Sequence, residues 1–244
     1  MTKISAGSYD LNKWLYGGYE TDVITTIFGP AGSGKTNFCL LATVSQAKKG
    51  NKVIYIDTEG GFSVERLKQI AAENYTEVLN NIVLLKPTKF SEQQEAFQTL
   101  LKEIKEKKNI GLIIVDGITM LYRLELAAAA KTEDKKKINE INAALAGQLR
   151  MLSEIARKHN IPVLVTNQVY SEFLTRKEIE ECKERRICMV GGDILKYWSK
   201  CIIEIQLKQG KRKAILRKHR SLPEKELDFI INSKGIEKAG FRIF

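Results

Sequence analysis

The chain has 244 residues, 43% of them hydrophobic, and its 40 Lys and Arg against 29 Asp and Glu give a formal net charge of +11. This length and apolar content can bury a full core, which excludes a small scaffold that depends on disulfides or metals. The sequence shows no apolar run long enough to cross a bilayer and no secretory signal, so we expect a cytoplasmic protein with no membrane partner.

Apolar runs alternate with helical stretches through the first two thirds of the chain. The predicted strands are 23–28 (VITTIF), 53–57 (VIYID), 82–85 (IVLL), 111–116 (GLIIVD) and 162–167 (PVLVTN). Continuous apolar strands joined through helices predict an α/β fold with a mainly parallel sheet flanked by helices. Residues 127–137 are expected to form a loop before a helix that ends near Lys158. After residue 200, strands joined by tight turns predict an antiparallel extension, and 1–244 is expected to be a single domain.

The segment FGPAGSGKTN, residues 28–37, follows the first predicted strand. It fits G-x-x-x-x-G-K-[ST], in which backbone N–H groups surround phosphates, the lysine reaches the β- and γ-phosphate oxygens and the hydroxyl binds Mg²⁺. A helix begins here, and its N-terminal dipole favours anions. The sequence therefore predicts that a nucleoside triphosphate binds with Mg²⁺. The residues expected to hold it are Gly29, Pro30, Ala31, Gly32, Ser33, Gly34, Lys35, Thr36 and Asn37.

Polar side chains follow three other predicted strands. Asp116 ends the strand 111–116, at the sheet edge where α/β proteins bind ligands, and is expected to reach Mg²⁺ through water beside Thr36. Glu59 follows 53–57 and is the candidate base that aligns the attacking water. Gln168 follows 162–167, where its amide would contact the γ-phosphate and the next loop. The alternatives are a turn-capping aspartate, a surface acid beside a glycine turn and an ordinary exposed amide.

Six segments occur in a fixed order: GPAGSGKT, YIDTEGGFSVERL, LIIVDGITMLYR, VLVTNQV, GGDILKYWSK and RKHRSLPE. In these segments the chain resembles the ATPase core of RecA/RadA-type recombinases over nearly its whole length. The resemblance implies a RecA-like phosphate-loop ATPase core that uses ATP and Mg²⁺ and binds DNA. It also implies that Glu59 polarises water, that Gln168 senses the γ-phosphate and that Arg66 packs on adenine, with Lys35 completing the catalytic set.

The resemblance further implies a homo-oligomer with ATP between two protomers. In the family a neighbour covers the base with an L-P-E segment, which here contains Pro223. Lys218 and Arg220 resemble the cations that related proteins insert toward the γ-phosphate, and such charges would make hydrolysis depend on assembly. The alternative for Lys218 and Arg220 is an edge strand whose charges simply face solvent.

The chain also departs from the family pattern. The N-terminal DNA-binding domain and the Phe-x-x-Ala docking segment of full recombinases are not found before the first predicted strand, and a basic residue of the family is Ser63 here. We therefore expect an accessory protein of homologous recombination and DNA repair, with weak Mg-dependent ATPase activity and no strand exchange by itself. Expected partners are a RadA-type recombinase and branched-DNA processing enzymes. The alternatives are an autonomous DNA-stimulated recombinase and a KaiC-like signalling ATPase that acts through protein contacts.

Two regions are candidates for binding DNA without reading its sequence. Residues 171–190, which correspond to the family's second DNA-binding loop, contain five basic residues and five glutamates and so carry no net charge. Between Ile205 and Pro223 lie seven cations and no acid, a composition suited to phosphate contacts, although a solvated charged hairpin is the alternative. The candidate DNA contacts are Lys208, Lys211, Arg212, Lys213, Arg185 and Arg186.

Overall fold

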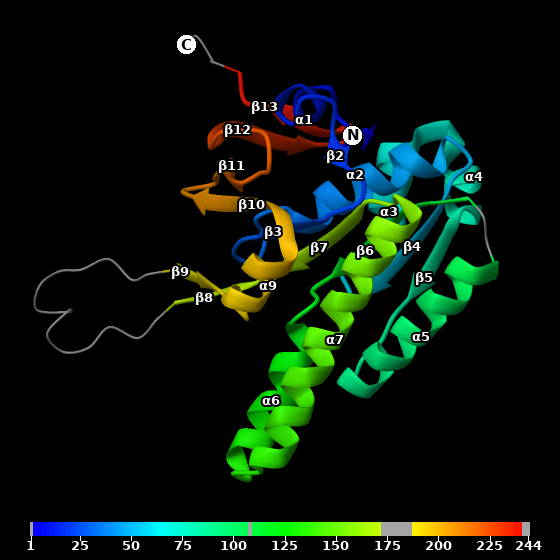
Figure 1. The fold of residues 1–244 in the computed structure, drawn as a ribbon. Coiled ribbons are helices and arrows are strands. Elements are labelled where there is room, and N and C mark those ends of the chain that lie inside the picture. Colours follow the sequence, from blue (N-terminus) through cyan, green and yellow to red (C-terminus); the bar gives the residue numbers. More distant parts are fainter. Residues whose placement is uncertain (1, 107–108, 172–186, 241–244) are drawn as a thin grey trace, which may run out of the picture.

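The structure, a computed structural model, describes residues 2–106, 109–171 and 187–240. Strands and helices alternate in the first part of the chain, and strands follow one another in the last part (Figure 1). The strands are β1 (Lys3–Ile4), β2 (Tyr19–Glu20), β3 (Ile24–Phe28), β4 (Lys52–Asp57), β5 (Ile82–Leu85), β6 (Ile110–Asp116), β7 (Val163–Asn167), β8 (Val169–Ser171), β9 (Ile187–Met189), β10 (Ser199–Lys208), β11 (Lys211–Lys218), β12 (Lys225–Asn232) and β13 (Gly235–Lys238). The helices are α1 (Tyr9–Trp14), α2 (Lys35–Ala47), α3 (Val64–Ala71), α4 (Tyr75–Asn80), α5 (Phe90–Glu106), α6 (Met120–Lys131), α7 (Lys135–His159) and α9 (Gly192–Trp198), with a short 3₁₀ helix at Ala72–Asn74.

The described residues form a central sheet of nine strands in the order β13-β12-β11-β10-β3-β7-β6-β4-β5. The strands from β10 to β5 in this order are parallel, whereas β10 to β13 pair antiparallel through consecutive hairpins. This arrangement confirms the predicted fold class. β10 joins the two parts, since it is parallel to β3 on one side and antiparallel to β11 on the other.

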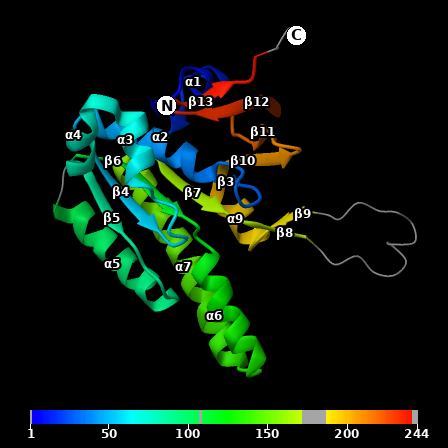
Figure 2. The same cartoon turned by 180° about the vertical axis from the view of Figure 1, so that it is seen from behind.

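Helices cover both faces of the sheet, so successive residues of one strand enter different cores. Figure 2 shows helices on both sides of the sheet. Val53 and Tyr55 of β4 pack into the core closed by α1 to α4, and Ile54 and Ile56 pack into the core closed by α5, α7 and α9. This alternation follows from the two-residue period of a strand. Burial on both faces explains why the predicted strands appear in the sequence as uninterrupted apolar runs.

The prediction of a loop over residues 127–137 is wrong. α6 continues through the four alanines to Lys131, and α7 already begins at Lys135. Alanine is the strongest helix former, and Asp134 caps α7 by accepting a hydrogen bond from the Lys137 backbone N–H at 2.9 Å. A small apolar cluster that includes Leu121 and Ile141 holds the two helices together. The α6–α7 pair therefore forms a helical hairpin that projects beyond the sheet in both views (Figures 1 and 2).

The parallel strands place the polar segments of the sequence at one edge of the sheet. β3, β4, β6 and β7 all end at this edge, and Asp57 lies directly beside Asp116 in the register of β4 and β6. Loops that follow the carboxyl ends of such strands converge on a common crevice. In the described part of the chain no helix combines the length and hydrophobicity needed to cross a membrane.

Replacement of Leu149 by alanine tests the second core. Leu149 of α7 is fully buried, so Leu149→Ala should lower the free energy of unfolding by about 3 kcal/mol through lost burial and an unfilled cavity. Leu124→Ala in α6 is the matched control, since Leu124 is 59% exposed and its loss should cost about 0.5 kcal/mol or less. Urea denaturation measures both values. Equal losses in the two variants would contradict the packing described here.

Candidate nucleotide site

The phosphate loop joins β3 to α2, and glycine is required at two of its positions. A Cβ on Gly29 would lie 2.3 Å from the carbonyl oxygen of Ile205 in β10, closer than any side chain permits. Gly34 has a φ of 111° at the N-cap of α2, a conformation that residues with a side chain rarely adopt. The loop is therefore fixed against β10 at one end and turned into the helix at the other.

Lys35 is buried and bends back over its own loop. Its Nζ donates hydrogen bonds of 3.0 Å to the carbonyl oxygens of Gly29 and Pro30. Burial lowers the pKa of this ammonium group, and the nearby charges of Glu59 and Asp116 oppose that effect. Phosphate oxygens are stronger acceptors than peptide carbonyls, so an incoming phosphate can replace these contacts.

Thr36 and Asp116 both lie beside Gly61. A Cβ built on Gly61 would be 3.2 Å from Thr36 Oγ1 and 3.7 Å from Asp116 Oδ2, so both oxygens border one small space. A hydroxyl and a carboxylate suit Mg²⁺, which keeps most of its waters. Asp116 is buried and already accepts hydrogen bonds from Tyr55 Oη at 2.7 Å and Thr166 Oγ1 at 2.5 Å. The residues present fit a magnesium ion held by Thr36, with Asp116 acting through water.

Asp57 has a structural task instead. Its carboxylate accepts backbone N–H bonds from Glu59 at 3.3 Å, Gly61 at 3.1 Å and Phe62 at 3.0 Å. These bonds fix the turn after β4. Asp57 thereby determines where Glu59 stands relative to the phosphate loop.

Glu59 and Gln168 contact each other across the mouth of the pocket, with Gln168 Nε2 donating to Glu59 Oε2 at 2.9 Å. Partial desolvation raises the pKa of Glu59, while the Gln168 hydrogen bond and the charge of Lys35 oppose this increase. Both side chains line a cavity of about 460 Å³ together with Lys35 and Thr36 of the phosphate loop. The two residues that the sequence assigned to catalysis and to γ-phosphate sensing are thus direct partners.

Gln168 lies at the exit of β7, where the backbone is firmly held. The buried Asn167 accepts the Gln168 N–H at 2.9 Å and donates from Nδ2 to the Val190 carbonyl at 2.6 Å. The next residues form β8, which pairs antiparallel with β9. β8 and β9 flank residues 172–186, so the candidates Arg185 and Arg186 lie outside the described residues.

Arg66 connects three parts of the structure beside the phosphate loop. Its Nε donates to Asn37 Oδ1 at 2.8 Å, and its Nη1 contacts Gln69 Oε1 at 2.9 Å and the Ser233 carbonyl at 3.5 Å. The Arg66 side chain therefore links α3, to which it belongs, with the start of α2 and with the β12–β13 turn. Packing of Arg66 on adenine stays a prediction.

Lys218, Arg220 and Pro223 lie far from the phosphate loop of their own chain. In the β10–β11 register Arg212 pairs with Leu207 near the loop, whereas Lys218 pairs with Ile202, roughly 20 Å further along the strand. Lys218 Nζ donates to the Lys196 carbonyl at 2.7 Å, and Pro223 is exposed. If these residues contact a nucleotide, it must be the nucleotide of another protomer.

Arg220 already has acidic partners within the chain. It forms ion pairs with Glu20 at 2.8 Å and with Asp22 at 2.7 Å. The Glu20 side chain is only 2% exposed, so the guanidinium compensates a buried carboxylate. Insertion of Arg220 into a neighbour's site would require these pairs to break.

The basic tract is less positive in the folded protein than in the sequence. Lys213 pairs with Glu226, and Arg217 pairs with Glu204 and Glu224 at 2.6 Å each. Lys208 and Lys211 stand exposed beside the β10–β11 turn, and neither forms an ion pair with a described carboxylate. Arg212, which is also a candidate DNA contact, lines the cavity beside the phosphate loop.

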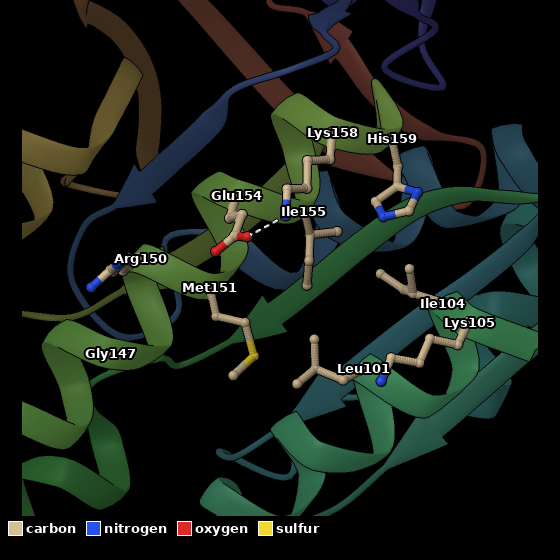
Figure 3. A pocket seen from close by; sticks show the side chains of 10 residues that line it. All are labelled: Leu101, Ile104, Lys105, Gly147, Arg150, Met151, Glu154, Ile155, Lys158 and His159. Atoms are coloured by element: carbon tan, nitrogen blue, oxygen red, sulfur yellow. Dashed lines mark hydrogen bonds and ion pairs between the residues drawn. The ribbon is translucent and has the colours of Figure 1, made fainter.

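A second hollow, of about 500 Å³, lies between α5 and α7 (Figure 3). Leu101 and Ile104 face Met151 and Ile155 across it, and the pair of Lys158 and Glu154 lies at its side. These residues belong to the carboxyl-terminal halves of their helices, which lead into the amino ends of β6 and β7. The hollow is therefore at the opposite edge of the sheet from the phosphate loop.

Sequence reasoning missed three residues of the site: Tyr55, Thr166 and Arg212. Tyr55 and Thr166 fix Asp116, but their contacts depend on the order of β4, β6 and β7 in the sheet, which no local pattern reveals. Arg212 had a usable signal. Arg212, Ala214 and Leu216 are two residues apart in β11, so they share one face of the strand. Ala214 and Leu216 pack into the core beneath α2, which places Arg212 on the face that carries the phosphate loop.

Comparison with known proteins gives consistent results. The Rad51 family model matches residues 1–239. The chain is 40% identical over 230 residues to the DNA repair and recombination protein RadB of Methanobrevibacter smithii, covering 93% of this chain and 92% of that protein. It is 41% identical over 228 residues to the protein of the same name from Methanococcus maripaludis strain C7, covering 93% and 97%. A crystal structure described as the RadB recombinase has 37% identity, a TM-score of 0.75 and coverage of 97% of this chain and 100% of that one.

Removal of the Gln168 amide should raise the pKa of Glu59 further, because the hydrogen bond that stabilises its ionised form is lost. Carbon-detected NMR titration of the Glu59 carboxyl in Gln168→Leu measures this change. Gln206→Leu is the control, since the Gln206 amide contacts Glu204 and should leave Glu59 unaffected. A pKa that stays constant or falls in Gln168→Leu would show that the two side chains do not interact.

Arg220→Ala should lower the free energy of unfolding by about 2 kcal/mol, because Glu20 keeps a buried charge without its main partner. Lys218→Ala removes an exposed side chain and should cost about 0.5 kcal/mol or less. Chemical denaturation of the two variants provides the comparison. Full stability in Arg220→Ala would mean that Arg220 is free to act outside its own chain.

Proposed function

Because this chain belongs to the Rad51 family, we propose that it is an ATP- and DNA-binding accessory protein of homologous recombination and DNA repair. It hydrolyses ATP slowly with Mg²⁺ and performs no strand exchange by itself. The relatives at about 40% identity are named DNA repair and recombination proteins, which supports the cellular process. The work on DNA is carried out in the cytoplasm, beside a RadA-type recombinase and enzymes that process branched DNA.

The contact between Glu59 and Gln168 is the observation that carries the proposal. A γ-phosphate entering this pocket offers acceptor oxygens to the Gln168 amide and competes with Glu59 for it. Gln168 directly precedes β8, and β8 leads to the segment that corresponds to a DNA-binding loop of the family. A movement of the Gln168 side chain on nucleotide binding would therefore act on the segment after β8, which is expected to approach DNA.

The chemistry of hydrolysis is assigned to groups already in place. Lys35 would bind the phosphate chain, Thr36 and, through water, Asp116 would hold Mg²⁺, and Glu59 would accept the proton of the attacking water. Bound Mg²⁺ supplies charge that offsets the negative charge of the phosphates. Since Glu59 acts in its ionised form and its pKa is raised, turnover should increase with pH through that pKa.

The open pocket of a single chain explains why turnover should be slow. Glu59 is exposed at the mouth of the cavity, whereas Lys218, which Arg220 and Pro223 follow, lies roughly 20 Å along β11 from Arg212. Charges work best when water is excluded from the site. A second protomer that covers the pocket with these residues would complete it, so ATP serves as a switch for assembly as well as a fuel.

The first DNA contacts are assigned to Lys208 and Lys211. Both are exposed beside the β10–β11 turn, near the carboxyl-terminal edge of the sheet. Contacts of lysine with phosphates fix a protein on DNA without reading its sequence. Lys213 contributes less because it is paired with Glu226.

The test is a titration of single-stranded and branched oligonucleotides at low salt, with and without a nonhydrolysable ATP analogue. The analogue should strengthen binding in the wild type and have no effect in Lys35→Ala. The double variant Lys208→Glu and Lys211→Glu should weaken binding about tenfold or more and flatten its salt dependence. Lys48→Glu and Lys49→Glu, at the distant end of α2, provide a charge-matched control.

The result can also contradict the proposal in two separate ways. A wild type that ignores every oligonucleotide would leave ATP-dependent protein contacts as the function. Rapid hydrolysis and filament formation on adding single-stranded DNA would instead identify an autonomous recombinase.

A further inference from the structure

Arg212 differs from the other cations of its strand in the direction of its side chain. It shares a face of β11 with Ala214 and Leu216, which pack into the core beneath α2. Lys213 lies on the opposite face, where it pairs with Glu226. Only β10 separates β11 from β3 in the sheet (Figure 2). Arg212 therefore reaches the phosphate loop that follows β3, where it contacts Gly32.

In the sheet, β11 lies on one side of β3, and β7 and β4 lie on the other. Arg212 therefore approaches the cavity from one side of the phosphate loop, and Gln168 and Glu59 approach it from the other. Both Arg212 and the loop residues Gly32, Lys35 and Thr36 line this cavity. Its Nη2 contacts the Gly32 carbonyl at the long distance of 3.4 Å. Its Nε is buried and has no hydrogen-bond partner among the described residues.

An arginine in this state has unused donors. A guanidinium presents five N–H donors in a planar fork, and a buried donor without a partner costs free energy. Arg217 on the same strand has two carboxylate partners, whereas Arg212 forms no ion pair with a described acid. The charge of Arg212 is therefore left for an anion from outside the chain.

We infer that Arg212 is a phosphate-binding residue of the nucleotide site, contributed by the same chain that supplies the phosphate loop. Its fork binds oxygens of the phosphate chain and replaces the weak Gly32 contact. Two cations then hold the phosphates, with Lys35 on the helix side and Arg212 on the side of β11. This inference rests on the proposed function, since it assigns a further residue to the same site.

The geometry gives a reason for arginine rather than lysine. The β11 backbone does not move to reach the loop, because Arg212 is held in register with Leu207 on one side and Phe229 on the other. A planar fork can contact two phosphate oxygens from such a fixed position, and an ammonium group acts as a single point of charge. Arg212→Lys should therefore recover only part of the binding.

Isothermal titration calorimetry tests the inference with two probes, ATP and inorganic tripolyphosphate, which carries the phosphates without the base. Arg212→Gln should raise the dissociation constant of each probe about 10- to 100-fold, the loss expected for charged hydrogen bonds. Arg212→Lys should lie between this variant and the wild type. Lys213→Gln, at the neighbouring position on the opposite face, should bind both probes like the wild type.

The outcomes separate this inference from the proposed function. If the wild type binds ATP and Lys35→Ala does not, but Arg212→Gln binds both probes as tightly as the wild type, the role of Arg212 is disproved and the ATP site stands. If the wild type binds no ATP, both proposals fail. The melting temperature without ligand shows whether Arg212→Gln is folded, and Arg212→Lys decides the question if it is not.

Discussion

The parallel pairing of β10 with β3 is the constraint on which the site depends. It brings the Ile205 carbonyl so close to Gly29 that no side chain fits between them, and the start of the phosphate loop is fixed as a result. The same pairing joins the antiparallel strands to the sheet, because β10 continues into the β10–β11 hairpin. One strand thus holds the loop and delivers a second set of side chains to it.

Charge pairing divides the cations of this protein into two groups. Lys213, Arg217 and Arg220 have carboxylate partners within the chain, and these pairs join the C-terminal strands to one another and to the segment around Glu20. Lys35 and Arg212 have no such partner among the described residues and lie at the pocket. Lys35 is buried and Arg212 is half-buried, and cations in such positions without a carboxylate partner are typical of sites that bind anions. The net charge of the chain therefore says less about its ligands than the positions of its unpaired cations.

The sequence predicted the parts of the structure that local rules determine. The five parallel strands, the antiparallel extension and the phosphate loop all follow from apolar runs, turns and a motif of fixed spacing. The resemblance to a family implied the separate roles of Glu59 and Gln168, but nothing in the sequence predicted their hydrogen bond, since it joins residues far apart in the chain. The predicted loop at 127–137 is wrong because alanine propensity and the Asp134 cap make two helices with a short turn, although the segment is polar and rich in lysine. The sequence could not show which cations of the basic tract have acidic partners. Glu204, Glu224 and Glu226 lie outside the tract, and they reach Lys213 and Arg217 only once the strands are paired.

The hydrogen bonds of Asn167 limit how the backbone beside the pocket can move. Its Oδ1 accepts from the Gln168 N–H and from the Thr119 hydroxyl, and its Nδ2 donates to the Val190 carbonyl. The Val190 N–H in turn donates to the Gln168 carbonyl, so the main chain at Gln168 is pinned from both sides. Sliding of β7 along its axis would break the bonds of Asn167 to Thr119 and Val190 and the bond between Val190 and Gln168. Under the proposed function, nucleotide binding would therefore act on this region by rotating the Gln168 side chain or by displacing β8 and β9 together.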